Sequence, residues 1–154
     1  MANKGIQRSA LVFHPAKRMF DLVNDVARYP EFVSGCQRAE ILSMDESQMV
    51  ARLTVSLGGI RKSFTTRNRL IDGRSIVLEL VDGPFENFSG RWDFFPLGSE
   101  GSKVMLTLHF SLASALWPFQ AGFCRMADRL VDDFCKRADQ VHGHDFSRNR
   151  LCGS

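Results

Sequence analysis

Residues 48–70, QMVARLTVSLGGIRKSFTTRNRL, decide the fold, because two alternating stretches flank the pair Gly58-Gly59. Alternation of apolar and polar residues with a period of two is typical of a half-buried strand. A pair of glycines between two such strands predicts a two-residue hairpin turn. The expected partners across this hairpin are Leu57 with Ile60, Leu53 with Phe64, and Ala51 with Thr66. The same inner face then continues through Asn68 and Leu70.

The strands that follow extend this hairpin into an antiparallel meander. Residues 72–74, DGR, predict a three-residue loop with a left-handed glycine, which pairs Leu70 with Ile76 and keeps Leu78 and Leu80 inside. Turns are expected at residues 82–85 and 96–101, and alternating strands at residues 88–94 and 104–112.

Helices are expected on both sides of this run of strands. A first strand over residues 6–13 leads to Pro15, which is tolerated in the first turn of a helix. That helix begins at Ala16 and loosens before Tyr29-Pro30, since a residue that precedes proline avoids the α conformation. A second helical turn is predicted to carry Phe32 and Val33. After Pro118 a helix of about six turns presents a broad apolar face, with Phe119, Phe123, Met126, Leu130, Phe134 and Ala138 on one stripe and Cys124, Ala127, Val131 and Cys135 beside it.

Composition places these elements in one ordinary domain. The chain has 154 residues, 44% hydrophobic residues and a net charge of +3, which is too weak to indicate a nucleic-acid partner by itself. No stretch approaches the roughly 20 apolar residues of a membrane span, and no signal-peptide core is present, so a soluble, cytoplasmic protein is expected. The four cysteines lack metal-ligand spacing. Residues 1–141 are expected to fold, and residues 142–154 to form a basic, disordered tail.

Several local motifs together resemble a known family. They are V-x-x-Y-P-x-F-V-x-x-C at residues 26–36, FTTRN at residues 64–68, and DGPF at residues 82–85 followed by Trp92, Phe94 and Pro96. The chain resembles the START-like coenzyme Q-binding family over roughly residues 4–141, and within it the bacterial branch of ribosome association toxins, through GGIR at 58–61 and SFTTRN at 63–68.

The resemblance implies an α+β helix-grip fold, START-like and Bet v 1-like, in which a curved antiparallel sheet wraps a long C-terminal helix and two short helices follow the first strand. It implies a non-enzymatic binder of ubiquinone or another isoprenoid lipid that supports respiration, working in the cytoplasm or at the inner membrane. The alternative that it implies is a toxin of a toxin-antitoxin system, which binds the large ribosomal subunit and blocks subunit association. A polyketide cyclase-like enzyme is the third reading.

A ligand cavity between sheet and helix is expected, although a tightly packed core would use the same residues. No metal, required cofactor or DNA partner is predicted. The candidate cavity residues are Phe64, Thr66, Asn68, Leu78, Leu80, Trp92, Phe94, Phe110, Phe123, Met126, Leu130 and Phe134. Thr66 and Asn68 are polar on an inward register, where an unpaired buried group costs about 1–3 kcal/mol. A ligand carbonyl, a trapped water, or exposure of Asn68 at an open end of the sheet would each satisfy them.

Two surface features complete the expected site. Four arginines fall on the outward face of the paired strands: Arg52, Arg61, Arg67 and Arg69. Their charges suit contact with ribosomal RNA or with anionic lipid headgroups, or they simply keep this face of the sheet solvated. Glu79 is the acidic residue expected to lie nearest to these arginines.

Tyr29, Pro30 and Phe32 are expected either to form a movable lid or to pack against the edge of the sheet.

Catalytic and metal-binding alternatives have little support in the sequence. Cys36, His109 and Asp93 match no catalytic spacing, and His109 alternates onto the outer face. His142 and His144 offer an incomplete set of metal ligands.

Overall fold

The computed structural model describes residues 4–142, which form one curved antiparallel sheet and the helices that line it. The elements in chain order are β1 (Lys4–Val12), α1 (Ala16–Asn24), the 3-10 helix η1 (Val26–Glu31), β2 (Cys36–Met44), β3 (Gln48–Leu57), β4 (Ile60–Ile71), β5 (Ser75–Asp82), β6 (Phe85–Leu97), β7 (Gly101–Leu112), the 3-10 helix η2 (Ser114–Phe119) and α2 (Gln120–His142).

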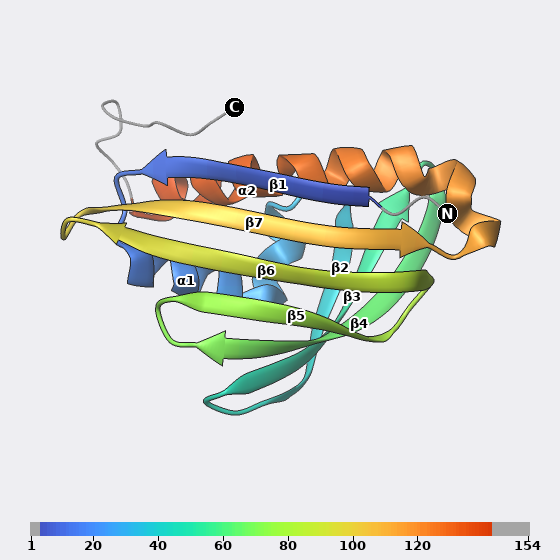
Figure 1. Ribbon diagram of the computed structural model, residues 1–154, viewed down its shortest axis with the longest axis horizontal. Helices are drawn as coiled ribbons and strands as arrows, with labels where there is room; N and C mark the ends of the chain where they lie inside the picture. The colour runs from blue at the N-terminus through green and yellow to red at the C-terminus, as the bar shows by residue number, and fades with distance from the viewer. Residues whose placement is uncertain (1–3, 143–154) are drawn as a thin grey trace.

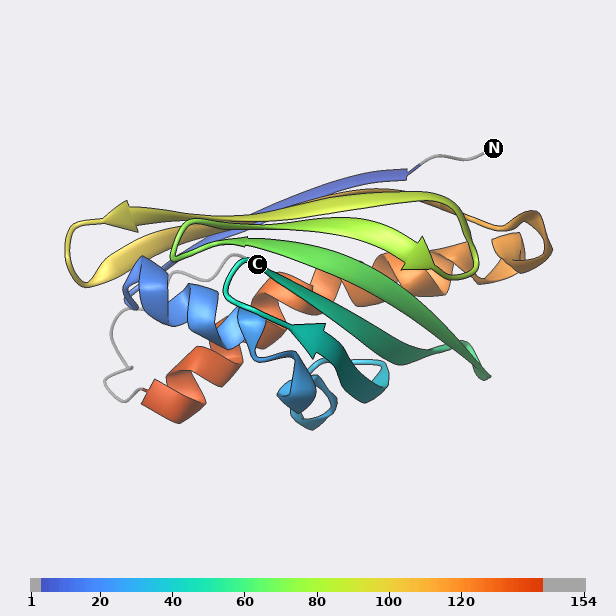
Figure 2. The same cartoon turned by 90° about the horizontal axis from the view of Figure 1, so that it is seen from below.

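The strands lie in the order β1-β7-β6-β5-β4-β3-β2, so the first strand returns to pair with the last one (Figure 1). The edge strands are therefore β1 and β2. Helix α2 runs along one face of the sheet, and α1 lies beside its C-terminal half (Figure 2). This arrangement confirms the predicted helix-grip fold, with a sheet that curves around a long final helix.

The predicted strand registers are confirmed. Leu57 pairs with Ile60 across the first hairpin, and the remaining partners follow the expected order down to Ala51 and Thr66. Both turn glycines have positive φ, 63° at Gly58 and 99° at Gly59, as a tight two-residue hairpin requires. The next hairpin pairs Leu70 with Ile76 as expected.

The core lies between β7 and the apolar face of α2. On β7 the inward residues are fully or almost fully buried: Val104, Leu106, Leu108, Phe110 and Leu112. On α2 the buried stripe is narrower than predicted and consists of Phe123, Ala127, Val131, Phe134, Cys135 and Ala138. Met126 and Leu130 are only half-buried. Phe119 precedes the helix at the end of η2.

Two parts of the predicted order need correction. The second helical turn is η1, which contains Tyr29 and Pro30, whereas Phe32 and Val33 follow it. The Tyr29 hydroxyl donates a hydrogen bond to the carbonyl of Val23 near the end of α1, which holds this turn in place. Strand β2 was missed, because most of its residues are exposed at the sheet edge and show no regular alternation.

The ends of the chain differ slightly from the expected boundaries. Helix α2 continues to His142, so the first residue of the predicted tail still belongs to this helix. The rest of that tail, residues 143–154, lies outside the described residues. Within residues 4–142 no helix has the length and hydropathy of a membrane span.

Candidate functional site

An apolar cavity of about 90 Å³ lies between α2 and the concave face of the sheet. Its wall combines residues from β2 to β7, η1 and α2. The predicted cavity residues that line it are Phe64, Thr66, Asn68, Leu78, Trp92, Phe123, Met126, Leu130 and Phe134. A helix that stands slightly off the sheet therefore leaves a small space in the centre of the fold.

Three predicted cavity residues lie elsewhere in the core. Phe94 packs edge-to-face against Phe20 of α1, with ring centroids 5.7 Å apart, so α1 covers it. Phe110 packs against Phe123 at 4.7 Å and belongs to the closed core near the start of α2. Leu80 is half-buried and lies outside the cavity wall. Alternation predicts an inward face, but it does not say which element covers each residue of that face.

The remaining wall residues were not among the predicted cavity residues, although Tyr29 was predicted as part of a lid. They are Val26, Tyr29, Val33, Cys36, Ala51, Leu53, Val55, Phe88, Leu106, Leu108 and Ala127. Those on β3 and β7 lie on inward registers that the sequence shows, so alternation could have identified them. Those on η1 and in the loop after it carry no periodic signal, since their position depends on how the 3-10 turn meets α2.

The predicted lid is fastened to α2 by several contacts. Phe32 packs edge-to-face on Phe134 with centroids 5.1 Å apart, and Tyr29 does so at 5.3 Å. The guanidinium of Arg137 lies 4.8 Å from the Phe32 ring centroid and 2.6 Å from the Glu31 carboxylate. The structure thus places Tyr29 on the cavity wall and Phe32 against α2, while Pro30 is exposed.

The loop after η1 is held in the same way, since the Ser34 backbone N–H donates to the Asp133 carboxylate at 2.9 Å. These contacts close the space over the cavity on the η1 side. Movement of this segment away from α2 stays a prediction.

A buried polar pair stands in the otherwise apolar wall. Asn68 is only 6% exposed, so the expectation that it could face solvent at an open end is wrong. The Thr66 hydroxyl donates a hydrogen bond of 2.8 Å to Asn68 Oδ1. The Asn68 amide group keeps its two N–H donors, for which the described residues supply no acceptor. The cavity therefore contains a hydrogen-bond donor suited to a carbonyl or a water molecule.

Removal of this hydroxyl should be more harmful than removal of the whole pair. We expect Thr66→Val to lower the free energy of unfolding by about 1–3 kcal/mol, because Asn68 Oδ1 loses its donor in a buried site. The double variant Thr66→Val/Asn68→Leu removes both polar groups and should regain most of that loss. Urea unfolding of the two variants measures the difference, and an equal loss in both would contradict the pairing argument.

The titratable groups at the cavity are held neutral. Burial raises the pKa of the Cys36 thiol, and desolvation also raises the pKa of the Tyr29 hydroxyl well above its ordinary value. A neutral thiol is a poor nucleophile. His109 and Asp93 lie on the outer face of the sheet, where Asp93 binds Arg91 at 2.8 Å. The structure therefore places Cys36 at the cavity and both His109 and Asp93 on the other face of the sheet, so these three residues do not meet.

The outer face of β2, β3 and β4 carries a cluster of arginines that we call the arginine face. It consists of the four predicted residues Arg52, Arg61, Arg67 and Arg69, together with Arg38 from the missed strand β2. Glu79 binds Arg69 at 3.0 Å, as its position suggested. Glu40, also on β2, lies 3.0 Å from Arg38 and 3.5 Å from Arg52.

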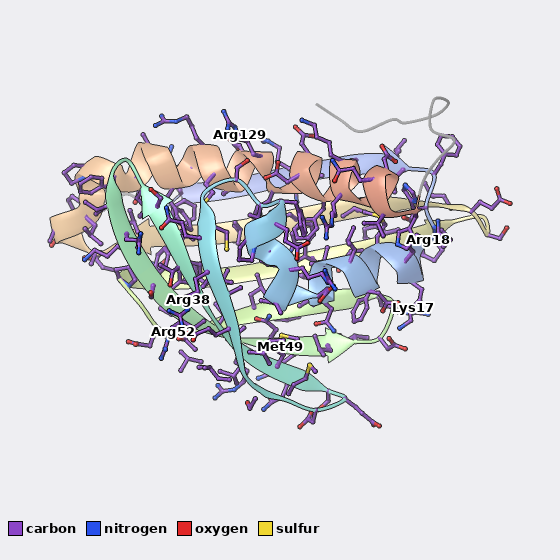
Figure 3. All side chains as sticks on the ribbon, turned by 180° about the vertical axis from the view of Figure 1, so that it is seen from behind. Lys17, Arg18, Arg38, Met49, Arg52 and Arg129 are labelled. Carbon is purple, nitrogen blue, oxygen red and sulfur yellow. The ribbon has the colours of Figure 1, made fainter. Side chains whose placement is uncertain are left out.

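Two members of this cluster keep their charge free for a partner. Within residues 4–142, neither Arg61 nor Arg67 forms an ion pair. Figure 3 shows Arg38 and Arg52 close together on neighbouring strands, and Arg129 projecting from α2 on the opposite side of the molecule. The arginine face is thus separate from the helix surface.

The described part of the chain contains no cluster of three or more metal-ligating side chains. Of the two histidines considered for metal binding, His142 lies in the last turn of α2, and His144 falls outside the described residues.

Comparison with known proteins identifies the family. The sequence pattern of the family described as "Polyketide cyclase / dehydrase and lipid transport" matches residues 12–135. The chain belongs to this family. One family relative is the ribosome association toxin RatA of Pseudomonas aeruginosa, which is 46% identical over 140 residues, covering 90% of this chain and 97% of the relative.

Two further proteins are similar to this chain, one in sequence and one in structure. The coenzyme Q-binding protein COQ10 homolog B of Xenopus laevis is 27% identical over 134 residues, covering 82% of this chain and 54% of that protein. The Zhui aromatase/cyclase of Streptomyces sp. R1128 has a similar structure, with a TM-score of 0.80, 22% identity, and coverage of 92% of this chain and 98% of that one. The last similarity shows the shared helix-grip fold alone.

Proposed function

We propose that this chain binds the large ribosomal subunit through the arginine face and keeps it from joining the small subunit. The observation that carries this proposal is the pair Arg61 and Arg67, which lie on an outer sheet face without ion-pair partners among the described residues. Guanidinium groups bind phosphates in planar, bidentate geometry, and ribosomal RNA offers these in abundance. Relatives named ribosome association toxins, at 46% identity, support this reading over ubiquinone binding.

The cavity gives less support to the carriage of an isoprenoid quinone. Pockets for drug-sized ligands usually span roughly 300–1,000 Å³, whereas this cavity has about 90 Å³. A long isoprenoid chain would enter only if η1 and the loop after it moved off α2. The coenzyme Q-binding relative is also more distant, at 27% identity.

The proposed activity requires binding and no covalent chemistry. A protein that covers the joining surface of one subunit blocks association by occupancy alone. This mode of action agrees with the separation of Cys36 from His109 and Asp93 on opposite faces of the sheet. A protein that acts on ribosomes works in the cytoplasm, which is where we propose this chain acts.

Salt dependence provides a direct test of the proposal. We expect the protein to co-sediment with isolated large subunits, with a log affinity that falls linearly against log salt concentration, at a slope of about −2 or steeper. That slope corresponds to phosphate contacts by at least the two free arginines. Small subunits in a parallel experiment should bind much more weakly. Affinity that does not change with salt would contradict recognition of the RNA backbone.

The buried Thr66–Asn68 pair favours a second candidate function, the binding of a small apolar molecule that carries a hydrogen-bond acceptor. The free N–H donors of Asn68 would bind the acceptor, while rings such as Phe64, Trp92 and Phe123 enclose the apolar part. A buried polar group without a partner is costly, so a ligand or a water should occupy this position.

This second candidate is tested by mass spectrometry of an organic extract of gently purified protein. We expect one compound at stoichiometric amount, which the variant Leu130→Arg should lose because a charged side chain would enter the apolar cavity. The variant must first be shown to fold by circular dichroism. An extract of the parent protein without any such compound would exclude this candidate and leave the ribosome proposal intact.

A further inference from the structure

Large apolar side chains are exposed at the end of the sheet where β6 turns into β7. Leu11, Phe13, Phe95 and Leu97 are between 41% and 55% exposed. Leu11 and Phe95 are the two neighbours of Lys103 in the strand register, on β1 and β6, and Leu97 is the partner of Gly101 at the start of β7. Phe13 follows directly after β1. These four side chains, which we call the sheet-end patch, therefore gather around a single lysine.

The charges near this patch are mainly positive. Lys103 lies at its centre, and Arg74 is close by, since its backbone carbonyl accepts a hydrogen bond of 2.8 Å from the N–H of Phe94. Neither cation forms an ion pair within the described chain. Glu100, in the turn between β6 and β7, is the opposing acid, while Asp93 is occupied by Arg91.

We infer that the sheet-end patch docks the protein on an anionic lipid surface. In this arrangement the exposed Phe and Leu side chains enter the interface of the bilayer, and Lys103 and Arg74 meet lipid phosphates. Apolar side chains next to basic ones are the usual composition of an interfacial membrane contact. The β6–β7 turn protrudes at one extreme of the molecule (Figure 1), and a bilayer accepts a protrusion without a matching groove.

A second copy of the chain fits this patch less well. Symmetric contact would bring the patch lysines of both copies into one buried apolar interface, where an unpaired charge is costly. A lipid surface instead lets the lysine extend its charged end to the phosphates while its stem stays among the apolar side chains.

The patch is also distinct from the arginine face. Arg61 lies beside the hairpin at Gly58-Gly59, at the opposite end of the sheet from the β6–β7 turn (Figures 1 and 2). The inference therefore goes beyond the proposed ribosome binding and can fail independently of it.

Vesicle sedimentation tests this inference with the intact chain. We expect binding to vesicles of phosphatidylglycerol and phosphatidylethanolamine, and much weaker binding to phosphatidylcholine vesicles. Phe13→Ser/Phe95→Ser should reduce binding to the anionic vesicles by about tenfold or more, because two large apolar side chains no longer enter the bilayer. Leu42→Ser/Met44→Ser is the matched control: both residues are large, apolar and exposed on β2, away from the patch, and their loss should change little.

Four results would contradict the inference. The first is no sedimentation of the parent protein with anionic vesicles, and the second is an equal loss in the patch and control variants. The third is a dimer in analytical ultracentrifugation that the Phe13→Ser/Phe95→Ser change dissociates, since the patch would then bind a second copy. A Lys103→Glu variant that keeps full preference for anionic vesicles would likewise contradict the role of this charge.

Discussion

The double variant Arg61→Glu/Arg67→Glu is expected to bind the large ribosomal subunit about 100-fold more weakly than the parent protein. Each replacement removes one phosphate contact and adds a negative charge that the RNA backbone repels. The salt dependence should become shallower by about two in slope, since two fewer counterions are released. Co-sedimentation over a range of salt concentrations measures both quantities in the same experiment.

The fold should survive this change, because neither arginine takes part in an ion pair within the described residues. We expect the free energy of unfolding to change by less than about 0.5 kcal/mol, as is usual for surface substitutions. The matched control is Arg125→Glu/Arg129→Glu, which changes the net charge equally on exposed positions of α2. Binding that falls equally in both variants would show a general charge effect and contradict a site on the arginine face.

The largest loss of stability is expected from Phe134→Ala. The Phe134 side chain is 1% exposed, and its ring packs edge-to-face against Tyr29, Phe32 and Trp92. Its removal should lower the free energy of unfolding by about 3–5 kcal/mol, because transfer and cavity costs add. The variant also releases η1 from its main apolar contact on α2.

Chemical unfolding with urea measures this loss, and Phe95→Ala provides the comparison. Phe95 is 44% exposed at the end of the sheet, so its removal should cost within about 0.5 kcal/mol. A loss of less than about 1 kcal/mol for Phe134→Ala would contradict the packing of η1 against α2 around this ring.

Local signals in the sequence identified most strands of the sheet and the final helix. The glycine pair at 58–59 and the alternation on both sides of it determine the register of β3 and β4, because a slip by one residue would expose the entire apolar face. The final helix was equally clear, since its apolar residues recur at helical spacing over six turns. These features depend on neighbours in the sequence and can be read without the structure.

The missed strand β2 shows that alternation is a poor signal for an edge strand. An edge strand has one neighbour and buries few of its side chains, so residues 36–44 alternate poorly. Its absence from the prediction had a consequence for the surface, because Glu40 and Arg38 lie on it. Glu79 was therefore expected to be the acid nearest to the four arginines, whereas Arg52 has Glu40 at 3.5 Å.

The candidate cavity was only partly predictable for a related reason. An inward register identifies Trp92 and Phe94 equally well, but the structure places Trp92 on the cavity wall and Phe94 beneath α1. Which inward residue faces the cavity depends on the positions of α1, η1 and α2 across the sheet. That arrangement results from long-range packing, which no periodic pattern in the chain encodes.

Formation of complete ribosomes from purified bacterial subunits tests the central claim most directly. Light scattering reports the joining of the two subunits, with the protein first incubated with the large subunit. We predict that a modest excess of the parent protein prevents the rise in scattering, that the Arg125→Glu/Arg129→Glu control does the same, and that Arg61→Glu/Arg67→Glu permits full association. Normal association in the presence of saturating parent protein would contradict the proposed function, and inhibition by the Arg61→Glu/Arg67→Glu variant would contradict the assigned surface.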